Sequence, residues 1–510
     1  MALDPKVCSR ARLARDARFD GKFFIGVTTT KIYCRPICRT RFSKEENVRY
    51  FPTAAAAAEA GFRPCLRCRP ECSPGSAVWA GTRNTVSRAL HLITEGGLED
   101  GGVESLAERV GVGSRHLRRL FLRHVGATPA SVVQALRLHF AKRLIDETRL
   151  PMGQVALASG FGSVRRFNAA IRNVYHRAPT QIRGLAPRVS PQSGNDYLFK
   201  LSFRSPYNWK RTIEFLAAHL TPGIEAVHAG CYCRSISVQG VDGYFEVALD
   251  DESAALAVRI RYGEPRALFL IVERIRAMFD LNVDWDVIAE ALRVDPALAP
   301  RLDPEAGFRV PGCWSGFELA VRAILEQQTG VKVASALAGR LVEALGRPFS
   351  AVGEITRLFP TADALAEVDL TAIGLPPAKA ETIRALARAV RDDRVKFEGV
   401  VDCDAFLSQL MGLRGFTKWA GQYVAMRALR DPDGFPSDDV ALRRRFGNCT
   451  ALELEHRSEV WRPWRAYAAM LLWQTAEVTV DSLAARVLAD GPGPVRQSRT
   501  VRRARASGRD

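Results

Sequence analysis

The chain is 510 residues long, with a formal net charge of +18 and a pI near 9.7. This length predicts three or four domains, and so large an excess of basic residues favours a polyanionic partner, above all nucleic acid. The first 18 residues mix Asp, Lys and Arg without an apolar core, and no apolar run is long enough to cross a bilayer. These features argue against a secreted or membrane protein and favour the reducing cytoplasm, in association with the nucleoid.

Eleven cysteines, an odd and unevenly clustered number, indicate metal ligands and free thiols rather than a disulfide framework. Cys34 and Cys38 form a CxxxC pair, and Cys65 and Cys68 form a CxxC pair one spacer further on. This spacing predicts a tetrahedral Zn²⁺ site in a small domain over residues 1–75. Buried structural thiols are the alternative.

The sequence around these cysteines, residues 29–36 and 60–68, resembles the amino-terminal domain of the Ada family of adaptive-response methyltransferases. The resemblance implies that Cys34 is both a zinc ligand and the acceptor of a methyl group from a methylated DNA phosphate. A zinc-bound thiolate stays deprotonated and nucleophilic, and its methylation removes a negative charge, so the modified domain should bind DNA more tightly. Zinc with a purely structural role is the alternative, and Cys72 could compete as a ligand. The arginines placed to contact phosphate are Arg35, Arg39, Arg41, Arg63, Arg67 and Arg69.

Two helix-turn-helix patterns are predicted within residues 81–185, after a linker at 73–80. Gly111 permits the first turn, and Gly160 and Gly162 flank a phenylalanine in the second. Such a tandem pair resembles the AraC-type activators, which implies one helix in each of two successive major grooves. The first pattern has its predicted core at Leu106, Val110, Leu117 and Leu120. Base contacts are assigned to Arg115, Arg118, Arg165, Arg166 and Asn168, although an arginine can equally bind phosphate.

After a second linker at 187–194, residues 195–285 are predicted to form a small α/β domain. Residues 198–203 alternate like a strand, and a helix begins at Asn208. Further strands are predicted around Val238, 245–247 and 268–270. The segment resembles the domain that precedes the glycosylase helices in the AlkA family, and no chemistry is predicted in it.

Residues 286–490 have helical periodicity. Within them, residues 413–417 predict a tight turn between two helices, and a proline-rich turn must end the second helix. A further helix therefore starts near Ser437 with Asp438 and Asp439 at its amino end, where the helix dipole and free amides favour ionised carboxylates. A helix cap and nothing more is the alternative.

This arrangement resembles the helix-hairpin-helix DNA glycosylases, most closely the 3-methyladenine glycosylases of the AlkA type. The resemblance implies that hairpin amides grip a DNA phosphate. It also implies that Asp439 stabilises positive charge on the sugar of an extruded nucleotide. Trp419 stands where bifunctional relatives carry a Schiff-base lysine, so hydrolysis without strand cleavage is expected. The expected DNA contacts of this half are Gln328, at the position of the wedge residue, with Gly415, Thr417 and Lys418.

Trp419, Tyr423 and Trp473 fall where the family lines its base pocket with aromatic rings, and a plain core role is the alternative. Two positions depart from the family. Thr417 replaces a glycine, and a turn position that needs a positive φ tolerates threonine poorly, so either a weaker grip on phosphate or a reshaped turn is expected. Val440 replaces an aromatic residue.

The predicted fold is a multidomain α+β chain. Its parts are a Cys₄ zinc domain (1–75), an all-α double helix-turn-helix (81–185), a small α/β domain (195–285), an all-α helix-hairpin-helix domain (286–490) and a disordered basic tail (491–510). The two resemblances together imply a monomeric fusion that senses methyl phosphotriesters through Cys34, activates repair genes and excises alkylated bases such as 3-methyladenine. Zn²⁺ is the implied cofactor, and double-stranded DNA and RNA polymerase are the implied partners. A purely regulatory protein with a non-catalytic glycosylase-like scaffold is the alternative.

Overall fold

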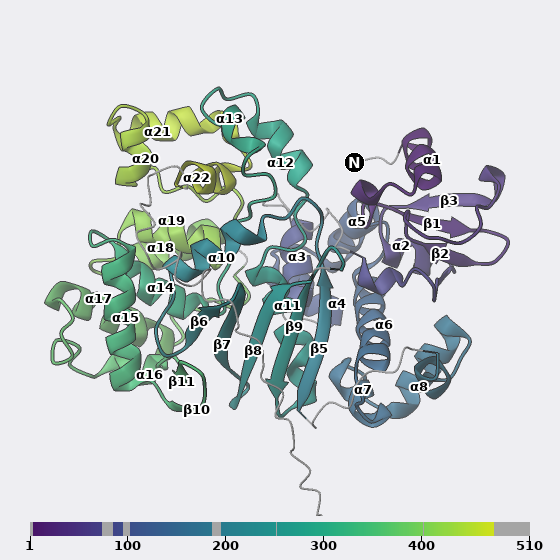
Figure 1. Cartoon of the computed structure of the whole chain (residues 1–510), viewed down its shortest axis with the longest axis horizontal. Coiled ribbons are helices and arrows are strands. Elements are labelled where there is room, and N and C mark those ends of the chain that lie inside the picture. The colour runs from purple at the N-terminus through teal and green to yellow at the C-terminus, as the bar shows by residue number, and fades with distance from the viewer. Residues whose placement is uncertain are drawn as a thin grey trace, which may run out of the picture.

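The computed structural model describes residues 4–73, 85–94, 102–185, 195–250, 252–400 and 402–473. The basic tail and both predicted linkers, apart from Ser73, lie outside these ranges. In Figure 1 the amino-terminal domain lies at the right, a five-stranded sheet in the centre and the carboxy-terminal helices at the left. No helix in these ranges is both long and apolar enough to span a membrane.

The amino-terminal domain is built on a four-stranded sheet of order β3-β1-β2-β4. Its strands are β1 (Phe24–Val27), β2 (Ile32–Cys34), β3 (Val48–Phe51) and β4 (Arg63–Pro64), and its helices are α1 (Pro5–Ala14) and α2 (Ala54–Glu59). Strands β2 and β4 run parallel, with Tyr33 opposite Pro64. Because each strand leads directly into a cysteine segment, parallel pairing brings the CxxxC and CxxC segments together.

Seven helices follow, in two groups joined by the long helix α6. They are α3 (Thr85–Thr94), α4 (Gly102–Arg109), α5 (Ser114–His124), α6 (Pro129–Glu147), α7 (Met152–Ala158), α8 (Val164–Tyr175) and α9 (Pro179–Arg183). Gly111 and Gly160 have φ of +75° and +74°, values that favour glycine at these turns. Leu106, Val110 and Leu117 are buried, as the periodicity predicts, while Leu120 is partly buried.

The central sheet is antiparallel, with strand order β5-β9-β8-β7-β6. It comprises β5 (Asp196–Ser202), β6 (Glu225–His228), β7 (Cys231–Val238), β8 (Val241–Leu249) and β9 (Ala255–Tyr262), together with α10 (Trp209–Ala218) and α11 (Leu268–Met278). The strand predicted at 268–270 is wrong, because these residues open helix α11. Leu268, Ile271, Val272 and Ile275 are all buried, a helical spacing that a three-residue apolar run hides.

The carboxy-terminal helices pack around two cores, one of their own and one that they share with the central sheet. They are α12 (Trp285–Leu292), α13 (Ala299–Leu302), α14 (Gly316–Glu326), α15 (Val331–Leu345), α16 (Ala362–Ala366), α17 (Pro377–Arg391), α18 (Cys403–Met411), α19 (Lys418–Arg427), α20 (Val440–Arg445), α21 (Ala451–Arg457) and α22 (Arg465–Trp473). A two-stranded hairpin, β10 (Pro348–Val352) and β11 (Ile355–Arg357), interrupts the helices that the periodicity predicts. Ile355 is buried against Cys233 and Tyr244, so the hairpin packs on the central sheet.

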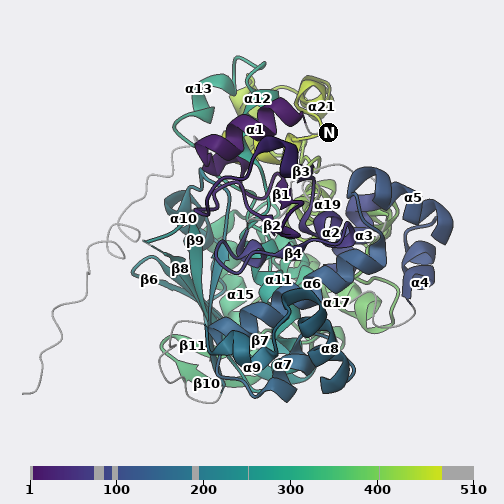
Figure 2. The ribbon, with the colours of Figure 1, turned by 90° about the vertical axis from the view of Figure 1, so that its right-hand side faces the viewer.

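The second helix-turn-helix group and the central sheet share one hydrophobic core. Phe140 on α6 lies edge-on to Phe269 with ring centroids 5.1 Å apart, and it stacks on Phe199 of β5 at 6.3 Å. The amino-terminal domain meets α6 through both kinds of contact: Ala55 of α2 shares a hydrophobic cluster with Val132 and Ala135, and the Tyr33 hydroxyl and His139 Nε2 lie 2.9 Å apart. Figure 2, which faces this side of the molecule, shows α6 lying between that domain and the sheet.

Candidate functional site

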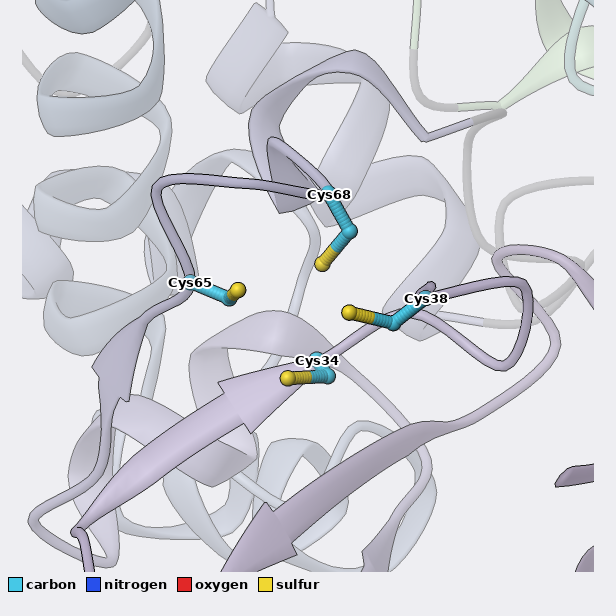
Figure 3. A group of neighbouring side chains, drawn as sticks. All are labelled: Cys34, Cys38, Cys65 and Cys68. Atoms are coloured by element: carbon cyan, nitrogen blue, oxygen red, sulfur yellow. The ribbon is translucent and has the colours of Figure 1, made fainter. Parts of the chain in front are cut away.

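The four predicted cysteines come together at one end of the amino-terminal sheet. Figure 3 shows Cys34, Cys38, Cys65 and Cys68 with their sulfur atoms turned toward one another, and these atoms all lie within 4.8 Å of each other. A zinc ion with Zn–S bonds of about 2.3 Å holds its ligand sulfurs about 3.8 Å apart in tetrahedral geometry. The cluster therefore fits zinc.

The thiols are electrostatically coupled. Hydrogen bonds from the neighbouring thiols lower the pKa of Cys38, and interactions with the same neighbours raise those of Cys34 and Cys68. Four thiolates at this spacing repel one another unless a cation lies among them, so the cluster is suited to a divalent ion. Cys72 lies outside the cluster, and burial raises its pKa to about 12.

The arginines around the cluster divide into two groups. Arg35 is held in place: its Nε donates to Asp20 at 2.8 Å and its backbone N–H donates to Cys68 Sγ at 3.4 Å. Arg69 forms ion pairs with Asp146 (3.1 Å) and Glu147 (2.9 Å) on helix α6. The exposed members of the predicted set are Arg39, Arg41 and Arg67.

A cavity of about 710 Å³ borders the cluster between the amino-terminal domain, α6 and the outer face of the central sheet. Cys68 and Arg67 line it from one side, and Cys231 lines it from the other. Cys34 itself is only 8% exposed, while Cys68 is the most open of the four ligands. The cavity therefore gives solvent access to the Cys68 side of the cluster.

The residues predicted to contact bases lie on helices α5 and α8. Arg115, Arg165 and Arg166 are exposed, and Asn168 is partly buried. Arg118 is also exposed but forms an ion pair with Glu104 at 3.3 Å. Both helices thus present basic side chains to solvent.

Asp439 is the N-cap of helix α20, and its carboxylate has three partners. Oδ1 accepts from the Leu442 backbone N–H at 2.8 Å and from Trp473 Nε1 at 3.2 Å, while Oδ2 accepts from Trp419 Nε1 at 2.8 Å. The cap predicted from the sequence is present, but two indole N–H groups from α19 and α22 go beyond it. They fix the direction of the carboxylate. Burial raises the pKa of the neighbouring Asp438 carboxyl group.

Three predicted aromatic residues surround Asp439. Trp419 stacks on Tyr423 with ring centroids 5.1 Å apart and an interplanar angle of 12°, and Tyr423 meets Trp473 edge-on at 6.2 Å. Tyr423 is buried, and Arg427 Nη1 donates to its hydroxyl at 2.6 Å. Val440, by contrast, is 56% exposed. Two of these rings, Trp419 and Trp473, thus contact the carboxylate, and Tyr423 packs against both.

The hairpin between α18 and α19 contains the predicted glycine turn. Gly415 has φ of +85°, and a Cβ there would lie 2.1 Å from Thr382 Oγ1, so only glycine fits. Thr417 has φ of −89° and is the N-cap of α19, accepting from the Ala420 N–H. Thr417 therefore sits in the hairpin without a positive φ, and the expected weaker grip on phosphate stays a prediction.

The turn after α14 is fastened to the hairpin. Gln327 Nε2 donates to the Gly415 carbonyl at 3.0 Å, and its Oε1 accepts from the Thr417 hydroxyl at 3.0 Å. Gln328 follows with an exposed side chain and a φ of +65°, so it projects from the tip of this turn. Lys379 Nζ donates to the carbonyls of three residues at the end of α14, namely Ile324, Leu325 and Gln327.

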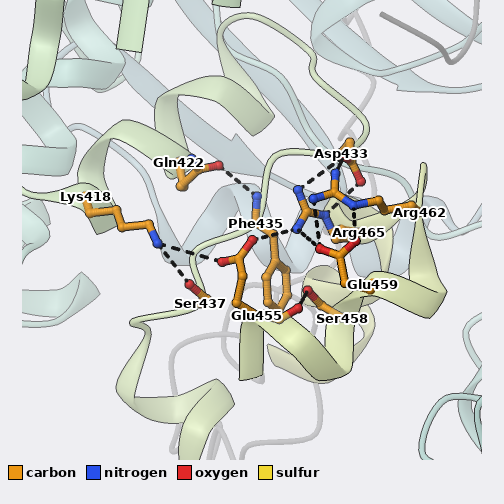
Figure 4. A network of polar contacts seen from close by, with 10 residues as sticks. All are labelled: Lys418, Gln422, Asp433, Phe435, Ser437, Glu455, Ser458, Glu459, Arg462 and Arg465. Carbon is orange, nitrogen blue, oxygen red and sulfur yellow. Dashed lines mark hydrogen bonds and ion pairs between the residues drawn. The ribbon is translucent and has the colours of Figure 1, made fainter. Parts of the chain in front are cut away.

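A network of ion pairs holds the loop that leads into Asp439 (Figure 4). Asp433 accepts from Arg465 Nε at 2.8 Å, and Arg465 also donates to Glu455 at 2.8 Å. Lys418 Nζ lies 3.5 Å from Ser437 Oγ and 3.8 Å from Glu455 Oε2. Sequence reasoning missed Asp433, Glu455 and Arg465. Their charges alone could have drawn attention to them, but nothing in their spacing pairs residues so far apart.

Sequence profiles of four families match the chain in succession. They are the metal-binding domain of Ada (residues 7–71), a helix-turn-helix domain (106–184), the AlkA N-terminal domain (198–315) and the HhH-GPD superfamily of base excision DNA repair proteins (321–464). The cysteine cluster falls within the first profile and Asp439 within the last. The cluster is thus a zinc site of the Ada type.

Three curated relatives match different parts of the chain. The DNA-3-methyladenine glycosylase 2 of Escherichia coli is 30% identical over 54% of this chain and 97% of its own. The activator and repair enzyme Ada of the same organism is 41% identical over 26% of this chain and 35% of its own. A Mycobacterium tuberculosis protein named a probable bifunctional transcriptional activator/DNA repair enzyme AlkA is 38% identical over 93% of this chain and 97% of its own. The chain therefore belongs to the family of bifunctional proteins that join an Ada-type regulatory half to an AlkA-type DNA glycosylase.

Proposed function

We propose that the two halves answer alkylation damage in DNA in two ways. The carboxy-terminal half hydrolyses the N-glycosidic bond of alkylated bases such as 3-methyladenine. The amino-terminal half accepts a methyl group from a DNA methylphosphotriester and activates transcription of repair genes. The observation that carries the proposal is the Asp439 carboxylate, which two indole N–H groups hold beside the stacked rings of Trp419 and Tyr423.

Asp439 supplies charge where the reaction develops it. As the bond from the sugar to an alkylated purine breaks, the electron pair leaves with the base and positive charge grows on the deoxyribose. A carboxylate fixed near that carbon stabilises the charge and accepts a proton from the attacking water. Trp419 and Trp473 keep both carboxylate oxygens in position, so little reorganisation is needed during the reaction.

Strand cleavage is not expected from this site. A Schiff base with the sugar requires an amine in contact with it, and the indole of Trp419 cannot form one. The amine nearest in sequence, that of Lys418, lies toward Ser437 and Glu455 (Figure 4). The product is therefore an intact strand with an abasic sugar.

The geometry also supports a base-flipping role for Gln328. Its exposed side chain stands at the tip of a turn that Gln327 ties to the hairpin, and in this proposal backbone N–H groups of the hairpin, at Gly415 among them, grip a phosphate. A side chain inserted into the stack at this point fills the space that the extruded base leaves, and an amide can hydrogen-bond the orphaned partner base. The flat faces of Trp419 and Tyr423 suit a cationic, electron-poor base.

In the amino-terminal half we assign Cys34 as the methyl acceptor. The S–CH₃ bond forms as the O–CH₃ bond of the phosphotriester breaks, and the DNA keeps a phosphodiester anion. Bound zinc supplies the positive charge that keeps the four thiols ionised. Each transfer consumes the cysteine and removes one negative charge from the cluster, so DNA is repelled less. The helix-turn-helix residues Arg115, Arg118, Arg165, Arg166 and Asn168 then hold the promoter, with RNA polymerase as the partner.

The test uses the whole chain, methylated duplex DNA and measurement of released bases. We expect Asp439→Asn to lose about 10³-fold in the rate of base release, the size typical of removing one group that stabilises transition-state charge. Asp402→Asn is the matched control, since Asp402 is an exposed N-cap of α18 that receives the same change. No release of any base by the unaltered chain would instead favour a regulator with a glycosylase-like scaffold.

A further inference from the structure

Helices α19 and α22 both bind the loop that leads into Asp439 (Figure 4). From α19, the Gln422 side chain accepts from the Phe435 backbone N–H at 3.0 Å. From α22, Arg465 Nε donates to Asp433 at 2.8 Å. Asp439 itself accepts from one indole N–H of each helix. The direction of its carboxylate therefore depends on how α19, α22 and the loop are placed relative to one another.

Glu455, on helix α21, links the same three elements a second time. Its Oε1 accepts from Arg465 Nη1 of α22 at 2.8 Å, and its Oε2 lies 3.8 Å from Lys418 Nζ of α19. Lys418 Nζ in turn donates to the Ser437 hydroxyl at 3.5 Å, two residues before Asp439 in the loop. One carboxylate thus connects both helices and the loop beside the catalytic aspartate.

The position of Glu455 favours a charged side chain. Burial opposes its ionisation, but hydrogen bonds from Ser437 and Arg465 outweigh burial, so the pKa of Glu455 is lowered. The Arg465 side chain is only 6% exposed, and its charge is balanced by Glu455 on one side and Asp433 on the other. Removing one partner of a buried ion pair is destabilising. A neutral residue at position 455 would therefore loosen Arg465 and, with it, the loop.

Lys418 has a second class of partner available. Its side chain is 53% exposed, and it directly follows Thr417, the N-cap of α19, in the hairpin expected to contact a DNA phosphate. A free ammonium group that binds phosphate releases a counterion from DNA, whereas an ammonium group already paired with a carboxylate gains less from that exchange. Glu455 therefore competes with the DNA backbone for Lys418.

We propose that Glu455 is a positioning residue of the glycosylase site with opposite effects on catalysis and on DNA affinity. Through Arg465 and Lys418 it holds the Asp439 loop in place, which raises the rate of base release. By pairing with Lys418 it also weakens binding to undamaged DNA. The inference rests on the glycosylase function proposed above. Weaker binding to undamaged DNA is useful to a repair enzyme, because damaged sites compete with a large excess of undamaged ones.

The test measures single-turnover base release from methylated duplex and binding to undamaged duplex over a range of salt concentrations, both with the whole chain. We expect Glu455→Gln to slow base release about 10-fold, less than the roughly 100-fold that a misplacement of about 1 Å can cost. The same variant should bind undamaged DNA about 2- to 5-fold more tightly, the size of an exposed ion pair. Its affinity should also depend more steeply on salt, by up to about one further phosphate contact.

Two further variants control for other causes. Glu343→Gln removes a carboxylate at an exposed position of α15 and should change neither the rate of base release nor the salt dependence. Lys418→Gln should weaken binding to undamaged DNA more in the Glu455→Gln background than in the unaltered chain, because only there is the amine released from its carboxylate. Equal effects of Lys418→Gln in both backgrounds would contradict competition for this amine.

The outcomes separate this proposal from the one on which it rests. Slower base release by Glu455→Gln with unchanged affinity and salt dependence would show a purely structural role and overturn the proposal. Base release at the unaltered rate, or weaker binding to undamaged DNA, would overturn it as well. Tighter binding also demonstrates that the variant is folded. If the unaltered chain releases no base, the glycosylase function itself fails, and the binding measurements alone then decide whether Glu455 competes with DNA for Lys418.

Discussion

The cysteine cluster and the Asp439 site differ in how the chain brings their groups together. The cluster draws all its ligands from 35 residues, from Cys34 to Cys68, and brings them together by pairing two short strands. The Asp439 site takes its groups from α19, α22 and the start of α20, and holds them through ion pairs between distant residues. In the functions proposed above, one reaction consumes the thiolate of the first site, whereas the charged groups of the second site are unchanged after each turnover.

Because the two sites are built from separate residues, we expect damage to one site to leave the other working. Cys34→Ser should abolish methyl transfer from methylphosphotriester DNA completely, because no other group in the cluster is assigned as acceptor. Mass spectrometry of the intact protein after incubation measures this. Base release from the same sample should match that of the unaltered chain. A methyl group found on Cys68, the most open ligand, would show that the acceptor has been assigned wrongly.

The two indole donors of Asp439 provide the next largest effect. A hydrogen bond to a charged group contributes about 1.5–3 kcal/mol, so Trp419→Phe should slow base excision roughly 10- to 100-fold while keeping the ring that stacks on Tyr423. Single-turnover rates on methylated duplex measure it. Trp285→Phe, a change in the core far along the chain, is the control for loss of an indole. Equal rates for Trp419→Phe and the unaltered chain would contradict a positioning role.

Acid stability tests His219, the partly buried C-cap residue of helix α10. His219 has its pKa lowered to about 3 in the folded chain, against about 6.5 when unfolded. Below pH 6.5 the unfolded chain binds a proton that the folded chain does not, so stability falls as pH falls toward 3. His219→Gln should reduce this fall by up to ~1.4 kcal/mol per pH unit. Denaturant midpoints at pH 7, 6 and 5 measure it, and unchanged slopes would contradict the neutral state.

The smallest effect is expected from a substitution in the hairpin, where stability and DNA affinity can be measured separately. Thr417→Ala removes the N-cap of α19, which should cost about 1 kcal/mol. It also removes the contact with Gln327, so affinity for DNA with an abasic site should weaken. Thr361→Ala removes the exposed cap of α16 and should cost a similar amount without changing DNA affinity. Thermal unfolding and binding titrations measure the two quantities, and equal affinities would show that the hairpin turn does not depend on Gln327.

The sequence could predict features that depend on neighbouring residues, but not contacts between residues far apart in the chain. The cysteine pairs, the two glycine turns and the cap before α20 are local patterns, and the structure contains all of them. The ion pairs of Asp433 with Arg465 join residues 32 positions apart and leave no periodic signal. The apolar run at 268–270 is too short to distinguish a strand from a helix, and the hairpin β10–β11 is explained only by the sheet on which it packs. At Thr417 the sequence could not give the backbone conformation, and only the structure shows that its φ is negative.

The single core that joins α6 to the central sheet has a consequence for how this protein can be divided. Phe140 packs on Phe199 and Phe269, so the regulatory and glycosylase halves meet through buried apolar side chains and not through a solvated surface. A fragment that starts at residue 195 would expose the apolar surface that packs on α6 and would tend to aggregate. A relative in Escherichia coli nevertheless consists of the glycosylase part alone and matches along 97% of its own length. An exchange of one half for that of a relative must therefore keep the apolar residues on both sides of this boundary complementary.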